Sequence, residues 1–302
     1  MKVSKNNSSF TILTMSFARD FQLCKLLCET IDAFVPQTIE HVLVVPSADL
    51  ATFSVLKASR RRIVAEDEFT PTWLRRMPSA PGWIRDRVRF ARRNVYFSFK
   101  GPPVRGWIVQ QLMKLRATEQ IGSDTIMHVD SDVAFVRPFE TDRVFRDGKA
   151  ALLRFPGEAN GPSHQPWHHA SSAALGLPDR RYFGADYISN CVIWRRSAAK
   201  AMLEHIRATT GKDPIAYLSR TPNFSEYILY GIFCEFVLGL GAAGHFASDE
   251  QLCKTLWTLD GHNVVEANEA FTKLDDEVAI GIQSTLPISI EKRQAILKRV
   301  ML

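Results

Sequence analysis

Short apolar runs alternate with an amphipathic segment over the first 70 residues of the chain. The runs at 10–15, 41–46 and 61–67 are rich in aliphatic and β-branched residues, which favour strands. Between the first two, apolar residues recur at helical spacing through 18–34. Strands that alternate with helices are typical of a parallel sheet with helices on its faces. We therefore predict an α/β fold.

A second amphipathic segment leads directly into a strongly apolar run. The segment 105–122 carries apolar residues near one stripe and ends at a glycine, as a helix does. The run at 125–129 follows at once, and Asp130 and Asp132 come directly after it. In open α/β sheets, ligands bind at the carboxyl ends of the strands. We expect both carboxylates at that edge.

The pattern is looser after residue 140. We predict strands at 150–155 and 187–196, and helices at 197–209 and 223–239. The stretch 156–186 is rich in Pro, Gly, His and Ser, and this composition favours a long binding loop. Without a repeat or a low-complexity linker, one domain is the simplest organisation.

Asp130 and Asp132 are two residues apart, so in a straight strand their side chains point to the same face. Two like charges this close repel each other unless a cation or a donor lies between them. A hard divalent ion, Mg²⁺ or Mn²⁺, suits such oxygen ligands and often binds substrate phosphates as well. The alternative is a pair of acids that caps a turn.

Three short elements, in order along the chain, resemble a known family. They are "RGWIVQQLMKL" at 105–115, "HVDSDVAFVRPF" at 128–139 and "FSEYILYG" at 224–231. The second is similar to the D-x-D element of GT-A-fold, nucleotide-sugar-dependent glycosyltransferases. Together the three resemble a group of uncharacterised bacterial glycosyltransferase-like proteins in which an "SEY" element follows the D-x-D.

The resemblance implies a GT-A-like (Rossmann-like) mixed, mainly parallel sheet with helices on both faces. It implies one domain over 1–302, with a nucleotide-sugar-binding half at 1–140 and an acceptor half with a C-terminal helix at 141–302. Asp132, with Asp130 directly or through water, would hold Mn²⁺ or Mg²⁺ against the diphosphate of a nucleoside diphosphate sugar. The sugar would pass to a hydroxyl of a glycan or lipid-linked acceptor, in bacterial polysaccharide or glycolipid synthesis.

Further residues are candidates under this resemblance. Thr14, Ser16 and Arg19 follow the first strand and are candidate nucleotide contacts, because that strand end lies near the base and ribose in such folds. Gln110 and Lys114, four apart on one helix face, are candidates for the sugar or diphosphate. Each of these residues also fits a plain surface or capping role.

An inverting transferase, the class we expect, needs a base to deprotonate the acceptor hydroxyl. Glu226 is our first candidate and lies in the first turn of a predicted helix, where it equally suits a cap. Asp186 is the second candidate. A retaining enzyme needs neither.

The third metal ligand stays open. The choices are His245, His262, Gln283 and Ser284. The histidines of "SHQPWHHA", namely His164, His168 and His169, we interpret as acceptor-loop residues around Trp167 rather than as a metal cluster, because an aromatic face suits a sugar ring.

The net charge of +6 is local: 57–105 alone carries thirteen Lys or Arg against four Asp or Glu. Such an excess favours an anionic partner, or simply a solvated face. A basic membrane-surface or nucleic-acid-binding protein is therefore an alternative, although helix-turn-helix and zinc-finger spacings are absent and we expect no nucleic acid. The basic amphipathic segment 289–302 is compatible with peripheral membrane contact or with docking on the body.

A second alternative is a haloacid-dehalogenase-like phosphatase with Asp130 as the nucleophile. Ala134 stands where those enzymes usually have Thr or Val, and their motif lies near the N-terminus.

The five cysteines are odd in number and lie in apolar surroundings, so we expect reduced core residues. The segment 1–21 is a poor secretory signal, and 227–246 carries Glu235, which favours a buried helix over a membrane span. We expect a cytoplasmic protein, with peripheral contact at the inner face of the membrane as an option.

Overall fold

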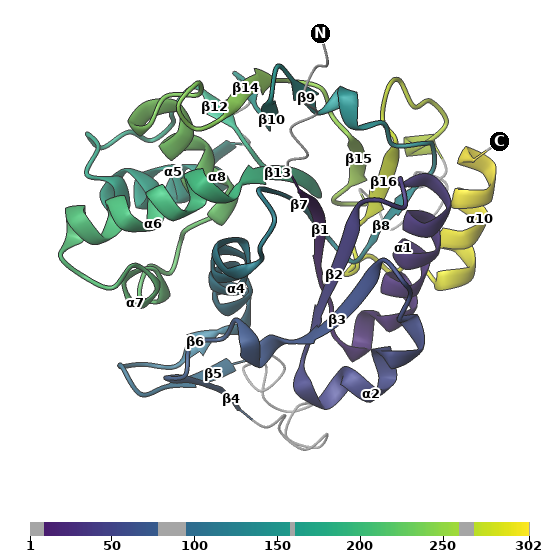
Figure 1. Ribbon diagram of the computed structural model, residues 1–302, viewed down its shortest axis with the longest axis horizontal. Coiled ribbons are helices and arrows are strands. Elements are labelled where there is room, and N and C mark those ends of the chain that lie inside the picture. The colour runs from purple at the N-terminus through teal and green to yellow at the C-terminus, as the bar shows by residue number, and fades with distance from the viewer. Residues whose placement is uncertain (1–8, 78–94, 158–160, 260–268, 302) are drawn as a thin grey trace, which may run out of the picture.

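A five-stranded sheet forms the centre of the protein. The computed structural model describes residues 9–77, 95–157, 161–259 and 269–301. The strand order is β13-β7-β1-β2-β3 (Figure 1), with β13 antiparallel to β7 and the others parallel. The bounds are β1 Phe10–Met15, β2 Glu40–Val45, β3 Arg61–Ala65, β7 Thr125–Val129 and β13 Cys191–Arg195. This sheet confirms the predicted α/β class.

Helices cover both faces of the sheet (Figure 1). Successive strand residues point to opposite faces, so Ile12 packs with Leu27 of one helix while Leu13 packs with Leu112 of another. Both of these helices follow the apolar periodicity of the sequence. The helices of this part are α1 Phe21–Phe34, the short α2 Leu50–Phe53 and α4 Gly106–Gln120.

A second sheet continues from the carboxylate pair. It has the order β15-β16-β8, in which β8 Val133–Phe135 directly follows Asp132. Its other strands are β15 Cys253–Leu256 and β16 Ala279–Ile282. The predicted C-terminal helix is confirmed as α10 Ile290–Val300, and it buries Ile296 and Leu297 against this sheet's core.

The segment 161–244 is mainly helical, and one prediction for it is wrong. The expected loop over 156–186 contains a helix, α5, with Pro166 in its interior. Tertiary packing accounts for it, because Ala170 and Ala174 are buried and α5 packs against α6 and α8. The elements are α5 Gly161–Leu175, α6 Arg196–Thr210, α7 Pro214–Ser219, α8 Glu226–Ile232 and a π-helical turn Phe233–Val237.

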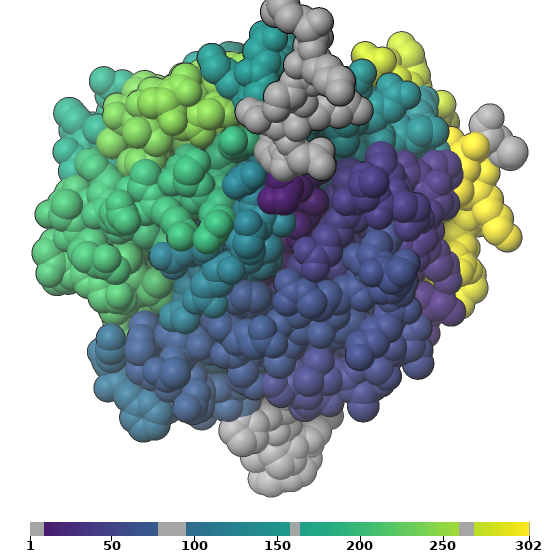
Figure 2. All heavy atoms as spheres, in the orientation of Figure 1, coloured from purple at the N-terminus to yellow at the C-terminus, as the bar shows by residue number. Residues whose placement is uncertain are grey.

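Three small sheets complete the fold. In the space-filling view, the green segments around α5 to α8 lie on one side and the purple and blue segments of residues 9–65 on the other (Figure 2). The small sheets consist of β4 Leu74–Arg76, β5 Val95–Ser98 and β6 Val104–Arg105; β9 Phe145–Arg146, β10 Lys149–Leu153 and β14 His245–Ser248; and β11 Phe155–Pro156 with β12 Ala185–Asp186.

Several smaller predictions also meet the structure. All five cysteines are buried and free, as expected. The 227–246 stretch forms α8, a turn and β14, and no helix in the described ranges is long and apolar enough to cross a membrane. Within the basic segment, Arg60 and Arg61 are buried and donate to backbone carbonyls, so they do not belong to a charged surface. Arg85 to Arg93 lie outside the described residues.

Candidate active site

The two carboxylates lie in the turn that links the main sheet to the second sheet. The backbone NH of Asp130 donates to the carbonyl of Asn190 (3.2 Å), which extends the β7–β13 pairing by one residue. Val133 NH then donates to Asp130 O (3.2 Å), and Ile282 NH donates to Asp132 O (3.2 Å). The pair therefore lies at the carboxyl end of β7, as predicted.

Asp132 is largely buried and has little to balance its charge. Its Oδ2 accepts one hydrogen bond, from the backbone NH of Ser284 (2.7 Å). Burial, and then the nearby charge of Asp130, raise the pKa of Asp132 to about 7. The remaining lone pairs of Asp132 are free to receive a cation.

Asp130 lies beside a buried lysine. Lys114 Nζ is 3.4 Å from Asp130 Oδ1, 3.0 Å from Glu226 Oε1 and 2.6 Å from Tyr227 Oη. Although burial alone would lower the pKa of Lys114, the negative charge of Asp130 and the partners on α8 hold it well above its ordinary value. Lys114 therefore stays charged and joins α4, β7 and α8 at one point.

Two buried amides nearby have unused hydrogen-bonding atoms. Gln111 Oε1 accepts from the backbone NH of Glu226 (3.0 Å), while Gln111 Nε2 has no partner among the described residues. Asn190 is 1% exposed, and neither of its side-chain polar atoms is bonded in the described part of the chain. A Cβ at Gly281 would lie 2.7 Å from Asn190 Nδ2, so only glycine leaves that amide its space. Unpaired buried amides are expensive unless a ligand or water completes them.

The candidate nucleotide contacts occupy different environments. Thr14 is buried and shares a hydrogen bond with His41 Nε2 (3.1 Å), and Ser16 is also buried. Arg19 is exposed and lies 3.5 Å from Asp20. Their roles stay predictions.

On α4, the structure brings Lys114 to the carboxylates together with Gln111, which the sequence reasoning missed in favour of Gln110. Gln110 is half-buried, and no described contact joins it to the site. The signal for Gln111 was its spacing of three from Lys114, which equally places it on the lysine's face.

The candidates for a third metal ligand lie at different distances from the carboxylate pair along the fold, some in the core and some on the loop that reaches Asp132. His245 lies in the core, bonded to Tyr230 Oη (2.7 Å) and to the Ala150 carbonyl (2.9 Å), and burial lowers its pKa to about 4. Gln283 and Ser284 lie on the loop that reaches Asp132. His262 falls outside the described residues. In the described ranges, no three His, Cys, Asp or Glu side chains group as a metal site.

Arg293 of α10 anchors the loop that reaches Asp132. It is 4% exposed and donates to three carbonyls, those of Ile282 (2.5 Å), Gln283 (3.0 Å) and Ile288 (3.0 Å). Its charge also lies near Asp132 and opposes the rise in that residue's pKa. The C-terminal helix therefore helps to fix the environment of the carboxylate pair.

Asp186, the second base candidate, lies in β12 with both of its carboxylate oxygens hydrogen-bonded. Its Oδ1 accepts from the backbone NH groups of Tyr187 (2.7 Å) and Ile188 (3.1 Å), and its Oδ2 pairs with His164 Nδ1 (2.5 Å). A Cβ at Gly231 would lie 2.2 Å from the ring of Tyr187, so the glycine lets this segment pack against α8. Asp186 is buried.

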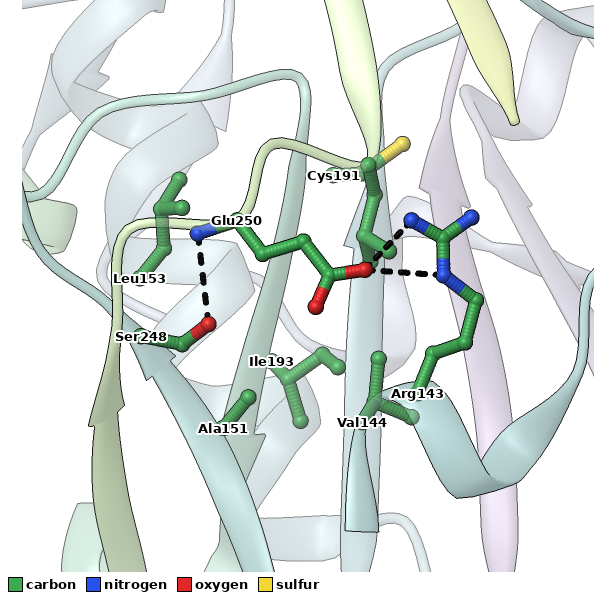
Figure 3. Close-up of a pocket in the computed structure, with 9 residues that line it drawn as sticks. Arg143, Val144, Ala151, Leu153, Cys191, Ile193, Ser248 and Glu250 are labelled. Atoms are coloured by element: carbon green, nitrogen blue, oxygen red, sulfur yellow. Dashed lines mark hydrogen bonds and ion pairs between the residues drawn. The ribbon is translucent and has the colours of Figure 1, made fainter. Parts of the chain in front are cut away.

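A small pocket on the opposite face of β13 is mainly apolar (Figure 3). Cys191 and Ile193 form one side of it, and Arg143 closes it by pairing with Glu250. Since residues alternate along a strand, Cys191 points away from the side chain of Asn190. None of the predicted site residues lines this pocket, and its apolar wall does not suit a diphosphate.

Residues 9–301 match the model of a family described only as a family of unknown function, DUF6492. The chain belongs to this family. No curated protein is similar enough in sequence to the DUF6492 chain to count as a match.

The DUF6492 chain is similar in structure to several solved glycosyltransferases. The galactosyltransferase LgtC, solved with donor and acceptor sugar analogues, matches with a TM-score of 0.50 and 12% identity over 96% of this chain and 95% of LgtC. The bifunctional glycosyltransferase WbbM matches with a TM-score of 0.50 and 10% identity over 99% of this chain and 50% of WbbM. At these identities the likeness establishes the fold, which is the predicted GT-A-like one.

Proposed function

We propose that this protein is a metal-dependent glycosyltransferase that uses a nucleoside diphosphate sugar. The observation that carries the proposal is the carboxylate pair at the carboxyl end of β7, in which Asp132 is partly buried and its side chain accepts a single described hydrogen bond. On a GT-A-like sheet, this is the edge where ligands bind. The likeness of the fold to two glycosyltransferases supports the same reading.

Asp130 and Asp132 are the residues that would hold Mn²⁺ or Mg²⁺, with the Gln283–Ser284 loop beside them. Two carboxylates and free oxygen lone pairs fit a hard divalent ion. When bound, such an ion stabilises the negative charge that develops on a departing diphosphate. Lys114 fixes the orientation of Asp130 and neutralises Glu226, and the amides of Asn190 and Gln111 offer hydrogen bonds to a bound donor.

The acceptor under this proposal is a hydroxyl of a glycan or of a lipid-linked sugar. This part of the proposal rests on the fold alone. The apolar side of α10 packs against the body, so membrane contact by the predicted route would involve the polar face of that helix. The phosphatase and nucleic-acid alternatives gain no support from the fold comparisons.

Calorimetric titration with UDP and with GDP, each with and without Mn²⁺, tests the proposal. We expect one nucleotide to bind only when the metal is present, because the diphosphate and two adjacent carboxylates repel each other without it. A protein that binds neither nucleotide under either condition contradicts the proposal. Metal-independent binding of equal strength contradicts the role of the carboxylate pair.

A further inference from the structure

A histidine–aspartate pair joins the start of α5 to β12. His164 Nδ1 lies 2.5 Å from Asp186 Oδ2, and the other oxygen of Asp186 is fixed by two backbone NH groups. Since a carboxylate only accepts hydrogen bonds, His164 Nδ1 is the donor. The neutral ring then carries its free lone pair on Nε2.

His164 Nε2 is available to a ligand. The side chain is 15% exposed, and nothing in the described ranges bonds to Nε2. A second pair on the same helix, His169 with Asp179 at 2.6 Å, is 63% and 68% exposed and simply faces water. The two pairs have the same chemistry but differ in burial. Only the His164 pair is held in a fixed, largely buried position.

The His164 pair lies along a line of side chains that ends at the carboxylates. The rings of His164 and Trp167 are 4.4 Å apart, and those of Trp167 and Trp107 are 6.1 Å apart. Trp107, Gln111 and Lys114 follow each other at spacings of four and three on one face of α4. At about 1.5 Å per residue, Trp107 lies about 10 Å from Lys114 along the helix axis. That span is comparable to the distance from a bound phosphate oxygen, through the anomeric carbon and the acceptor oxygen, to a base.

The chain also ties this pair to the carboxylates through residues 186–190, which lead into β13. Asp186 precedes Asn190 by four residues, and the Asn190 carbonyl accepts the hydrogen bond of Asp130 NH. Trp107 is 45% exposed, so its ring adds an open aromatic face beside Trp167, and Trp167 in turn lies against the imidazole. Aromatic faces beside a polar group suit the apolar faces of sugar rings.

We propose that His164 is the proton acceptor for the acceptor hydroxyl, that Asp186 positions it, and that Trp107 and Trp167 form the neighbouring acceptor subsite. The inference rests on the proposed function. The acceptor oxygen forms a bond to the anomeric carbon of the donor, and its proton passes to His164 Nε2. The bond from that carbon to the diphosphate oxygen breaks, and its electron pair leaves with the diphosphate.

Glu226 is the competing base from the sequence. It is 4% exposed and lies 3.0 Å from Lys114, so its charge is already neutralised by a buried partner. His164 has no cation beside it among the described contacts and has a free nitrogen. The geometry therefore favours His164 over Glu226 for this step.

Donor turnover with two nucleophiles tests the inference, because only one of them has a proton to lose. Wild-type protein with Mn²⁺ and UDP-glucose or GDP-mannose, according to the nucleotide selected by titration, is assayed in water and in sodium azide. We expect His164→Gln to lower transfer to water by about 100-fold or more. Azide is an anion that needs no base, so transfer to azide in His164→Gln should stay within about tenfold of wild type.

Asp186→Asn should show the same pattern more weakly. Asp186 only positions His164, so its loss should slow transfer to water, which needs His164 as the base, and should not slow transfer to azide. Asp179→Asn, in the exposed histidine–aspartate pair, is the matched control and should behave as wild type. Several results overturn the inference: unchanged transfer to water in His164→Gln, loss of both reactions, azide rescue of Glu226→Gln instead, or a wild type that binds donor but uses neither nucleophile. Absence of metal-dependent nucleotide binding in the wild type is the separate failure of the proposed function.

A labelling experiment checks the free nitrogen without turnover. Diethyl pyrocarbonate modifies neutral, accessible imidazoles, and peptide mass mapping locates the product. We expect His164 to be labelled along with the exposed His169. Burial lowers the pKa of His168 to about 4, so its ring is neutral, but it stays unmodified because it is inaccessible. Labelling of His169 without His164 contradicts an accessible Nε2.

Discussion

Two acidic groups meet at the end of β7, and they differ in what balances their charge. Glu226 is buried against Lys114, which also reaches Asp130. Asp132, two residues after Asp130, is partly buried, and its carboxylate has one hydrogen-bond partner among the described contacts, the NH of Ser284, with the charge of Arg293 nearby. A balanced buried acid contributes to rigid positioning, whereas an unbalanced one attracts a proton or a cation. The contrast supports a structural role for Glu226 and agrees with the proposed metal-binding role of Asp132.

Removing the balancing cation is the strongest way to break this contrast. Lys114→Met leaves Glu226 buried without a partner, and we expect the free energy of unfolding to fall by about 3–5 kcal/mol. Urea denaturation measures it. The double variant Lys114→Met/Glu226→Gln should recover part of the loss, because no uncompensated charge remains.

The matched control is Lys25→Met. Lys25 is half-exposed and lies 3.8 Å from Glu29 on the surface of α1. An exposed pair of this kind contributes less than about 1 kcal/mol, so the variant should unfold close to wild type. Equal losses of unfolding free energy in Lys114→Met and Lys25→Met would show that the buried Lys114 cluster stabilises the fold no more than a surface ion pair does.

The unbalanced acid should behave in the opposite way. Asp132→Asn keeps the shape of the side chain but removes its charge, so we expect metal-dependent nucleotide affinity to fall by about 100-fold or more. Calorimetry with Mn²⁺ measures the loss, and thermal melting should show an intact fold. Asp142→Asn, at an exposed position, is the control. Unchanged affinity in Asp132→Asn would mean that the pair only caps its turn.

The sequence is informative about this site where burial and spacing coincide. An apolar run followed by Asp130 and Asp132 predicts a strand end with two carboxylates, and the structure has both. The sequence also predicts Lys114 and its helix. It favours Gln110 over Gln111, although spacings of four and of three both place a residue on the face of Lys114, because one residue turns a helix by about 100° and the exact phase decides which side chain meets the site. Periodicity alone does not fix that phase when both faces of α4 are buried.

Other features depend on packing that no local pattern records. The composition of 156–186 favours a loop, yet α6 and α8 bury one side of α5 and stabilise it as a helix. The pairing of His164 with Asp186 joins positions 22 residues apart through that helix. The Gly231 contact with Tyr187 likewise appears only once α8 and β12 are side by side. These contacts are tertiary, so they escape a single sequence.

The last prediction concerns the pH dependence of stability to which Asp132 contributes. Its pKa in the folded protein is about 7, above the ordinary aspartate value, so the folded state binds this proton more tightly than the unfolded state. Between about pH 4 and 7 this residue therefore makes the protein less stable as the pH rises, by at most about 4 kcal/mol. Below and above that window it adds no slope.

Other groups titrate in the same window, so a single curve does not identify Asp132. Burial also raises the pKa of Glu66, which adds a slope of the same sign, while it lowers the pKa of His41 and His128, which makes stability rise with pH up to about 6.5. The difference between wild type and Asp132→Asn cancels these contributions. We expect Asp132→Asn to gain stability relative to wild type between pH 5 and pH 8, and Mn²⁺ at pH 8 to stabilise wild type alone. If the difference in stability between the two proteins does not change with pH, Asp132 has the ordinary pKa of an exposed acid. The contrast between Asp132 and Glu226 would then consist only of the ion pair that Glu226 forms with Lys114.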